Sequence, residues 1–177
     1  MAKRAYGVLA QVNRTMISRN RETVTNLYKV FVRPMIESAV EAWSPWERKD
    51  IDMLEKIQRR ATRMISGIGK LNYEDRLREC DLTTLEQRRK RGDMIRMFKM
   101  TNEYSSFDMT SSLCYTSQRH DVQTRSSLNK SLVPEKCRLD VRKHIFTNRS
   151  AQAWNTLPID VREAGSVNNI FKNMYDD

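Results

Sequence analysis

The sequence predicts a mainly α protein. A helical bundle, residues 1–103, is expected to be followed by a linker, 104–117, and a small, mostly helical C-terminal module, 118–177. Three observations favour this fold class. Only 5 Gly and 4 Pro, the residues that interrupt helices, occur among 177 residues. Charged residues make up 31% of the chain and the mean hydropathy is -0.71, as expected of a solvated surface. Apolar residues also recur every three to four positions over long segments, which is typical of helices with one buried face.

The N-terminal segment, residues 1–17, is predicted to form a first helix, because its apolar residues share one side and its basic residues lie outside them. The apolar set is Val8, Leu9, Val12 and Met16. Asn20 is expected to cap the next helix, since its side chain can accept a hydrogen bond from a free N–H group of the first turn. Glu22 then lies in that first turn, where the helix dipole favours an acid.

The stretch from Leu27 to Trp46 is the most apolar in the chain and carries a proline in its middle. One helical face is expected to hold Leu27, Tyr28, Phe31, Met35, Ala39, Ala42 and Trp46. After Pro34 the apolar arc widens, because Ile36, Val40 and Trp43 add a second flank, so the second half is predicted to be the hub of the core. Pro34 removes one amide donor and crowds the carbonyl four residues back, at a cost of ~3 kcal/mol in a regular helix. This predicts a kink or a junction between two helices, and Ser44-Pro45 is expected to end the element.

The segment from Lys49 to Ser66 has the clearest amphipathic pattern. Its apolar stripe consists of Ile51, Leu54, Ile57, Ala61, Met64 and Ile65. Its opposite face gathers Lys49, Lys56, Arg59, Arg60 and Arg63. The helix is expected to end at Gly67 and Gly69.

A short helix is predicted from Tyr73 to Cys80, and a longer one follows to about Thr101. Thr83-Thr84-Leu85-Glu86 fits a capping box, the pattern that opens many helices. The long helix has no single apolar stripe, so it is either packed on two sides or broken at Gly92. Its basic residues Arg88, Arg89, Arg96 and Lys99 are expected to share one side.

Residues 102–129 are rich in Ser and Thr and weakly periodic, so an irregular segment is expected, with short strands near Ser127 to Val133. A helix is then predicted from about Asp140 to Trp154, ended by Pro158, and Ser166 is expected to cap a last short helix. The aligned apolar residues of the longer helix are Leu139, Phe146, Ala153 and Leu157.

Patterns for catalysis or cofactor binding are sparse. Gly67-Ile68-Gly69-Lys70 lacks the length and glycine spacing of a phosphate-binding loop, and the cysteines and histidines show no nucleophile–base arrangement. Four potential zinc ligands have five, sixteen and six residues between them, unlike the close pairs of structural zinc sites, so buried or incidental Cys and exposed His are preferred. They are Cys114, His120, Cys137 and His144. No cofactor is therefore expected in this chain.

The charge balance predicts a polyanionic partner. Lys and Arg number 32 against 22 acids, for a net charge of +10 and a pI near 9.8, which favours nucleic acid over a membrane. The longest apolar runs are far below the roughly 18 residues that span a bilayer. One basic helix face alone fits an ordinary solvated surface, but two such faces in one basic chain favour contact with a nucleic-acid backbone. The predicted binding residues are Lys56, Arg59, Arg60, Arg63, Arg88, Arg89, Arg96 and Lys99.

Five sequence blocks follow one another in a specific order and spacing. They are LYKVFVRPMIESAVEAWSPW, KDIDMLEKIQRRATRMISG, LNYEDRL, LTTLEQRRKRGDMIRMFK and CRLDVRKHIFTNRSAQAWNTLPIDVREAGSVNNIFKN. Together they resemble the region downstream of the catalytic palm in jockey-like non-LTR retrotransposon reverse transcriptases. The resemblance runs from about Lys3 to the C-terminus.

The resemblance implies the helical thumb and C-terminal extension of an RNA-directed DNA polymerase, which grip the RNA template and the growing DNA strand. Lys56 to Arg63 would belong to the thumb and Arg88 to Lys99 to the helix after it. The family's catalytic aspartates and their Mg²⁺ belong to the palm. Its tyrosine-x-Asp-Asp loop is not matched by Met174-Tyr175-Asp176-Asp177, where tyrosine directly precedes the acids. This chain alone is therefore expected to be non-catalytic.

The expected partners are RNA and DNA as a template-primer duplex, and the palm domain of the parent polymerase. An intracellular location, in the nucleus and cytoplasm, is expected, because the three cysteines do not form a disulfide framework and no secretory signal follows Met1. A second hypothesis stays open. The chain is then a protein-interaction or scaffold fragment that packs on a missing palm or self-associates, or a relic that a host has reused.

Overall fold

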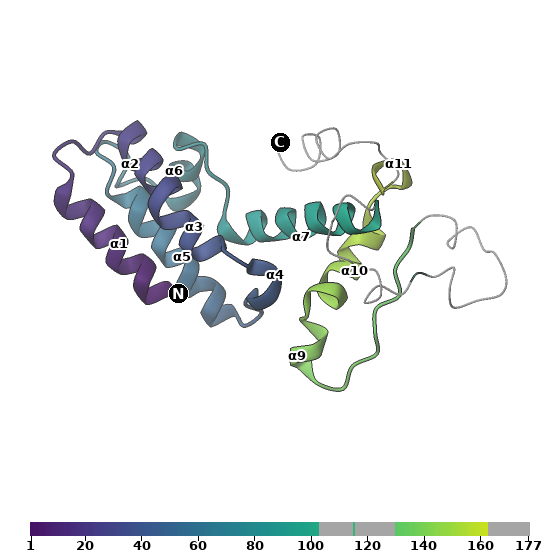
Figure 1. Ribbon diagram of the computed structural model, residues 1–177. Coiled ribbons are helices and arrows are strands. Elements are labelled where there is room, and N and C mark those ends of the chain that lie inside the picture. Colours follow the sequence, from purple (N-terminus) through teal and green to yellow (C-terminus); the bar gives the residue numbers. More distant parts are fainter. Residues whose placement is uncertain (103–114, 116–129, 163–177) are drawn as a thin grey trace, which may run out of the picture. The chain divides into compact units, whose positions relative to one another are not determined.

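The computed structural model of the protein describes residues 1–102, 115 and 130–162 (Figure 1). Helices dominate these residues, and the β pairing among them is one isolated antiparallel bridge between Tyr115 and Leu132. The prediction of a mainly α fold is confirmed. The chain divides into two compact units, unit 1 (Met1–Arg89) and unit 2 (Lys90–Asp177). This division falls inside a helix, whereas the sequence predicted a boundary after residue 103. The predicted linker, 104–117, lies outside the described residues apart from residue 115.

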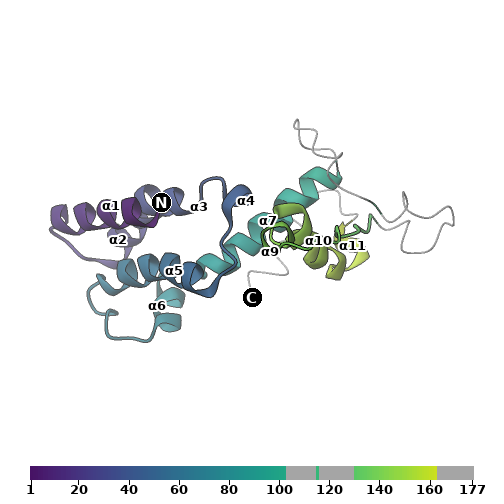
Figure 2. The ribbon, with the colours of Figure 1, turned by 90° about the horizontal axis from the view of Figure 1, so that it is seen from below.

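Unit 1 is a small helical bundle with α5 in its middle. Its helices are α1 (Ala2–Thr15), α2 (Arg21–Leu27), the π-helix η1 (Tyr28–Val32), α3 (Arg33–Glu37), α4 (Val40–Trp43), α5 (Arg48–Arg63), α6 (Tyr73–Glu79) and the start of α7 (Leu85–Thr101). α5 contacts α1, α2 and α6, and α1 also packs against η1 and α3 (Figures 1 and 2). The predicted helices at 1–17, 49–66 and 73–80 are confirmed. Asn20 caps α2 as predicted, because its Oδ1 accepts the Thr23 N–H at 2.8 Å.

The inward face of α5 supplies Leu54, Ile57 and Ala61 to the main core of unit 1. The other buried members of this core are Ala5, Leu9, Tyr28, Val32, Ile36 and Leu85. The two glycines that were predicted to end this helix both occupy positions that require glycine. Gly67 adopts φ +87°, a conformation that favours glycine, and a Cβ at Gly69 would lie 2.7 Å from the carbonyl oxygen of Arg63.

The apolar stretch from Leu27 to Trp46 forms three short helices rather than two halves of one. At its start, the Arg33 N–H bonds to the Tyr28 carbonyl five residues back, which makes a π turn. Pro34 lies in the first turn of α3, where its missing N–H costs little, so the predicted junction is confirmed. Ala39 then takes a left-handed conformation, φ +54°, and separates α3 from α4.

The predicted buried face of this stretch is wrong at several positions. The buried residues are Tyr28, Val32, Ile36 and Val40, each four residues after the last. Phe31 and Trp46 were expected on the buried face, but they are 53% and 44% exposed. The π turn holds more residues than an α turn, so side chains within it, such as Phe31, do not follow the α-helical spacing used for the prediction. Trp46 lies beyond the left-handed residue Ala39 and the end of α4, where that spacing no longer applies.

α7 begins with a capping box one residue later than predicted. The N–H of Gln87 donates to Thr84 Oγ1 and the N–H of Thr84 donates to Gln87 Oε1, both at 3.1 Å. The predicted box from Thr83 to Glu86 is therefore wrong, since Gln serves as well as Glu at this position. α7 continues through Gly92 without a break, so the alternative of a broken helix is wrong and its contacts agree with the alternative of packing on two sides. Its first residue, Leu85, joins the core of unit 1, while its later turns belong to unit 2.

A buried polar network runs through unit 1 and centres on the fully buried side chain of Gln58. The phenol of Tyr28 donates to Gln58 Oε1 at 2.7 Å. Gln58 Nε2 donates to the Thr83 carbonyl at 2.8 Å and to the Tyr73 hydroxyl at 3.0 Å. Tyr73 in turn donates to the buried carboxylate of Glu55. That carboxylate also accepts the N–H at the start of α7, so a negative charge lies at the positive end of a helix.

Unit 2 packs the later part of α7 against α10. Its other described helices are α9 (Asp140–Lys143), α10 (Phe146–Thr156) and α11 (Ile159–Arg162). The core of unit 2 consists of Met94, Met97, Phe98, Met100, Leu132, Phe146, Ala151, Trp154 and Leu157. Arg149 and Asp93 form two hydrogen bonds of 2.9 Å between α10 and α7. Because this pair is largely shielded from water, it fixes how the two helices meet.

The predicted C-terminal helix from Asp140 to Trp154 is wrong in two respects, its continuity and its buried face. It is interrupted at His144 and Ile145, where the backbone leaves the helical conformation, so α9 and α10 are separate. Leu139, 71% exposed, and Ala153, also exposed, were both expected on the apolar face. α10 ends at Thr156, just before Pro158, as predicted. The predicted helix capped by Ser166 lies outside the described residues.

The Tyr28–Gln58 hydrogen bond can be tested by substitution. Tyr28→Phe leaves a buried amide oxygen without its donor, so we expect a loss of about 1–2 kcal/mol in the free energy of unfolding, measured with urea. Tyr6→Phe is the matched control, because the structure shows no hydrogen bond to the Tyr6 hydroxyl among the described residues; a change within about 0.5 kcal/mol is expected. Equal losses in the two variants would contradict this account of the network.

The same tyrosine predicts a loss of stability at alkaline pH. Burial, with a smaller contribution from the charge of Glu37, raises the pKa of Tyr28 far above its usual range. In the unfolded chain a tyrosine ionises near pH 10. Above that pH the unfolded state holds fewer protons than the folded state, so stability falls with pH by up to about 1.4 kcal/mol per unit. Urea unfolding of the native protein between pH 9 and 11 should show a steeper fall than that of Tyr28→Phe.

Candidate nucleic-acid interface

The outer face of α5 carries Lys56, Arg59, Arg60 and Arg63, all exposed. We call these four residues the α5 basic face. They lie outward because the helical period turns Leu54, Ile57 and Ala61 toward the core. Within the described part of the chain, none of the four forms an ion pair with a carboxylate.

The basic residues at the beginning of α5, in contrast, form ion pairs with acids. Arg48 lies 3.3 Å from Asp52 and 3.2 Å from Glu86, and Lys49 lies 2.6 Å from Glu47. These cations are matched locally, so the uncompensated positive charge is concentrated on the C-terminal half of the helix. The helix dipole stabilises cations at that end, and Arg60 and Arg63 lie in the last turn.

Tyr73, at the start of α6, packs against Arg59 of this face and against Arg76 of α6. The guanidinium of Arg59 stands 4.8 Å from the centre of the Tyr73 ring, and that of Arg76 stands 5.6 Å from it. Arg76 is only 3% exposed, and it donates from Nε to Thr62 Oγ1 at 3.1 Å and from Nη1 to the Leu71 carbonyl at 2.7 Å. Burial, and then the nearby charge of Arg63, lowers the pKa of Arg76.

Sequence reasoning missed Arg76 and Tyr73 as parts of the site. The two residues are three apart, a spacing that places side chains together on one face of a helix. A Tyr-x-x-Arg pattern was therefore visible. The sequence did not show that this pattern belongs to the site, because the pattern alone does not show that α6 packs against α5 beside Arg59.

The second predicted set, on α7, does not form one exposed basic face. Arg89 is only 6% exposed. Arg88 is half-buried and holds Glu37 through two hydrogen bonds, of 2.5 and 3.1 Å, and the bonded carboxylate raises the pKa of the Arg88 guanidinium. Arg96 is half-buried and Lys99 is exposed, and both belong to unit 2. The structure therefore leaves the α5 basic face as the stronger candidate.

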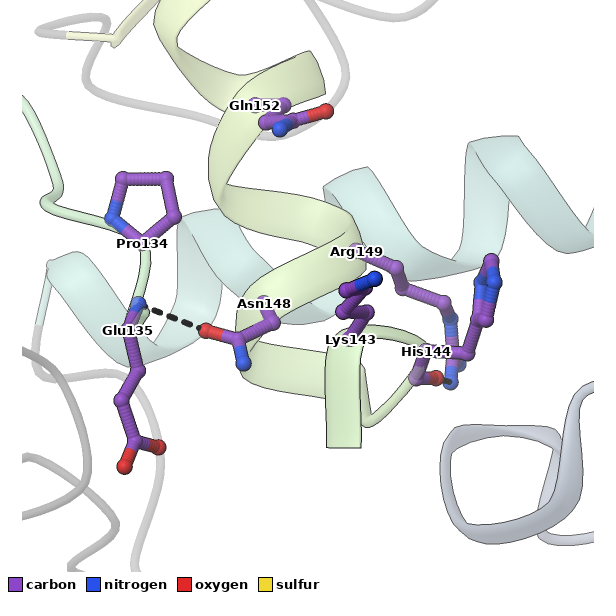
Figure 3. Close-up of a pocket in the computed structure, with 7 residues that line it drawn as sticks. All are labelled: Pro134, Glu135, Lys143, His144, Asn148, Arg149 and Gln152. Carbon is purple, nitrogen blue, oxygen red and sulfur yellow. Dashed lines mark hydrogen bonds between the residues drawn. The ribbon is translucent and has the colours of Figure 1, made fainter. Parts of the chain in front are cut away.

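Unit 2 contains one described hollow, of about 350 Å³ (Figure 3). Asn148 projects from α10 toward the backbone of Glu135, whose N–H it accepts at 2.9 Å, while His144 and Arg149 lie on the other side of α10. The cations at its rim already form ion pairs: Lys143 lies 2.8 Å from Asp140, and Arg149 is bonded to Asp93. This hollow is therefore a weaker place for a phosphate than the α5 basic face.

The possible zinc ligands are only partly described. Cys114 and His120 lie outside the described residues, as do Tyr175 and the acids after it. The thiol of Cys137 donates to the Glu135 carbonyl at 3.2 Å and accepts a hydrogen bond from Asn148. No group of three or more potential metal-binding side chains occurs within residues 1–102, 115 and 130–162.

No protein family, curated protein or solved structure matches the chain. Among the helices in the described ranges, none is long and apolar enough to cross a membrane.

The structural role of Arg88 gives a prediction. Arg88→Met leaves the half-buried Glu37 without its closest partner, so we expect about 1–2 kcal/mol less stability in urea unfolding. A double-mutant cycle with Glu37→Gln should show that the two losses are not additive.

The nucleic-acid affinity of Arg88→Met at a fixed salt concentration should stay within about twofold of the native value if the α5 basic face, rather than α7, makes the contacts.

Proposed function

We propose that this protein is a non-catalytic thumb and downstream segment of a retroelement RNA-directed DNA polymerase, and that it grips template-primer nucleic acid through the α5 basic face. The observation that carries the proposal is the row of four exposed cations on one helix face, without carboxylate partners among the described residues. Such a row neutralises successive phosphates and releases the counterions that these had condensed. The resemblance of the five sequence blocks supports the choice of polymerase segment.

The contacts in this proposal are to the backbone of the nucleic acid rather than to its bases. Arg and Lys on a helix can reach phosphates, and such contacts position a protein without reading sequence. The ring of Tyr73 is covered by Arg59 at 4.8 Å and is therefore occupied. Base stacking on that ring is not part of the proposed function. Shape and 2′-hydroxyl contacts would supply the preference for an RNA-containing duplex.

A second function is favoured by apolar residues on the surface of unit 1. Val30 and Phe31, next to each other in η1, are 62% and 53% exposed. Adjacent exposed apolar side chains are typical of surfaces that another protein covers. Under this alternative the chain is an interaction fragment that packs on a palm domain or self-associates. Sedimentation velocity over a range of protein concentrations, without nucleic acid, would show self-association in that case.

Salt dependence tests the primary proposal. Binding of a 20-base-pair RNA–DNA duplex should weaken with salt, with a log–log slope of about -0.7 to -0.9 for each phosphate contact. Four contacts predict a total slope of about -2.8 to -3.6. A slope near zero would count against the proposal.

A charge-matched pair of variants separates the α5 basic face from overall charge. In the test variant, Lys56, Arg59, Arg60 and Arg63 are all replaced by Ala. The control replaces Lys3, Arg4, Arg14 and Arg19, which are also exposed and lie in or next to α1. Both variants lose four positive charges. The test variant should lose at least about tenfold in affinity and most of the salt slope, whereas the control should keep most of both. Equal losses would show that only net charge matters.

A further inference from the structure

Three arginines gather where α5 meets α6, and the innermost of them is buried without a counter-ion. Arg76 has the hydroxyl of Thr62, the carbonyl of Leu71 and the ring of Tyr73 as its partners. None of these groups is negatively charged, and no described carboxylate forms an ion pair with Arg76. Buried cations are usually paired with an acid, because an isolated charge in a protein interior is costly.

The other two arginines add to this unbalanced charge. Arg59 and Arg63 are one turn apart on α5, a spacing that places side chains next to each other. Both are close enough to Arg76 for their charges to disfavour its protonated state. Three like charges therefore lie close to one another, and no described carboxylate forms an ion pair with any of them; the nearby carboxylate of Glu55 is bonded to the Tyr73 hydroxyl instead. A bound anion would relieve their repulsion.

Arg59 differs from the other members of the α5 basic face in being oriented before any ligand arrives. Its guanidinium lies over the Tyr73 ring. That ring is itself held by the hydrogen bonds of its hydroxyl to Glu55 and Gln58. A guanidinium in a fixed orientation loses less rotational freedom when it forms two parallel hydrogen bonds to a phosphate. Arg60 has no such ring contact among the described residues.

We propose that Arg59 and Arg63 form a clamp for one phosphodiester of a nucleic-acid backbone, with Tyr73 orienting Arg59 and the buried Arg76 supplying uncompensated charge beside the clamp. This inference rests on the proposed nucleic-acid binding of the α5 basic face and assigns unequal roles to its residues. Lys56 and Arg60 flank the clamp on the same face. The positive surface therefore continues past a single phosphate, as an internal stretch of backbone requires and a terminal phosphate does not.

A pair of charge-conserving variants tests the clamp. Arg59→Lys keeps the charge but loses the planar two-point contact and the stacking on Tyr73, so affinity for a duplex with hydroxyl ends should fall about five- to tenfold. Arg60→Lys is the matched control and should change affinity by less than about twofold. The salt slope should be the same in both variants, since neither alters the number of charges. Equal affinities of the two variants would overturn the clamp while leaving salt-dependent binding intact.

Tyr73 provides a second, independent test. Tyr73→Leu removes the ring and should reduce affinity as much as Arg59→Lys does, with no further loss in the double variant, because both changes remove one preorganised contact. Tyr73→Phe keeps the ring under Arg59 but loses the hydroxyl bonds that hold it, so its loss of affinity should be smaller than that of Tyr73→Leu. Circular dichroism confirms that each variant is folded. Additive losses in the double variant would overturn the role of Tyr73, and a loss seen only with 5′-phosphorylated duplexes would overturn the choice of an internal phosphodiester. If the native protein does not bind duplex at all, the proposed function itself fails.

Discussion

The amide side chain of Gln58 is fully buried in unit 1, and its hydrogen bonds constrain the packing of several chain segments. It accepts from the phenol of Tyr28 and donates to Tyr73 and to the carbonyl of Thr83. A buried amide that loses a partner destabilises the fold, so η1, α6 and the entrance to α7 can each meet α5 in only one register. The contact with α6 places the Tyr73 ring beside Arg59.

The basic residues of unit 1 have two different roles. Arg88 and Arg48 hold acids on other segments and so connect elements of the bundle. The α5 basic face forms no ion pair among the described residues and lies where the helix dipole favours positive charge. The fold can therefore carry these charges without ion-pair partners among the described residues, since the nearest acids of α5, Asp52 and Glu55, bond to other groups. An excess of positive charge that packing does not use is the property that a polyanion-binding surface needs.

Pro34 affects a larger region than its own turn. A proline in the first turn of α3 cannot donate to the carbonyl four residues back, and the π turn before it accommodates that missing bond. The extra residue in the turn rotates the segment, which buries Val32 and leaves Val30 and Phe31 exposed. One local backbone constraint thus creates the apolar surface that supports the alternative, protein-binding function. The nucleic-acid proposal depends on α5 and is independent of this turn.

Helical periodicity alone determined the existence of α1, α5 and α6 and the outward position of the α5 basic face, because the period of a helix is a local property of the chain. The tertiary structure decided which basic residues stay accessible. Arg89 and Arg76 are buried and Arg88 is paired with Glu37. These outcomes depend on segments brought together from distant parts of the sequence, as do the two cores that α7 serves. A pattern along one helix cannot reveal its neighbours, since burial and ion pairing are set by long-range packing.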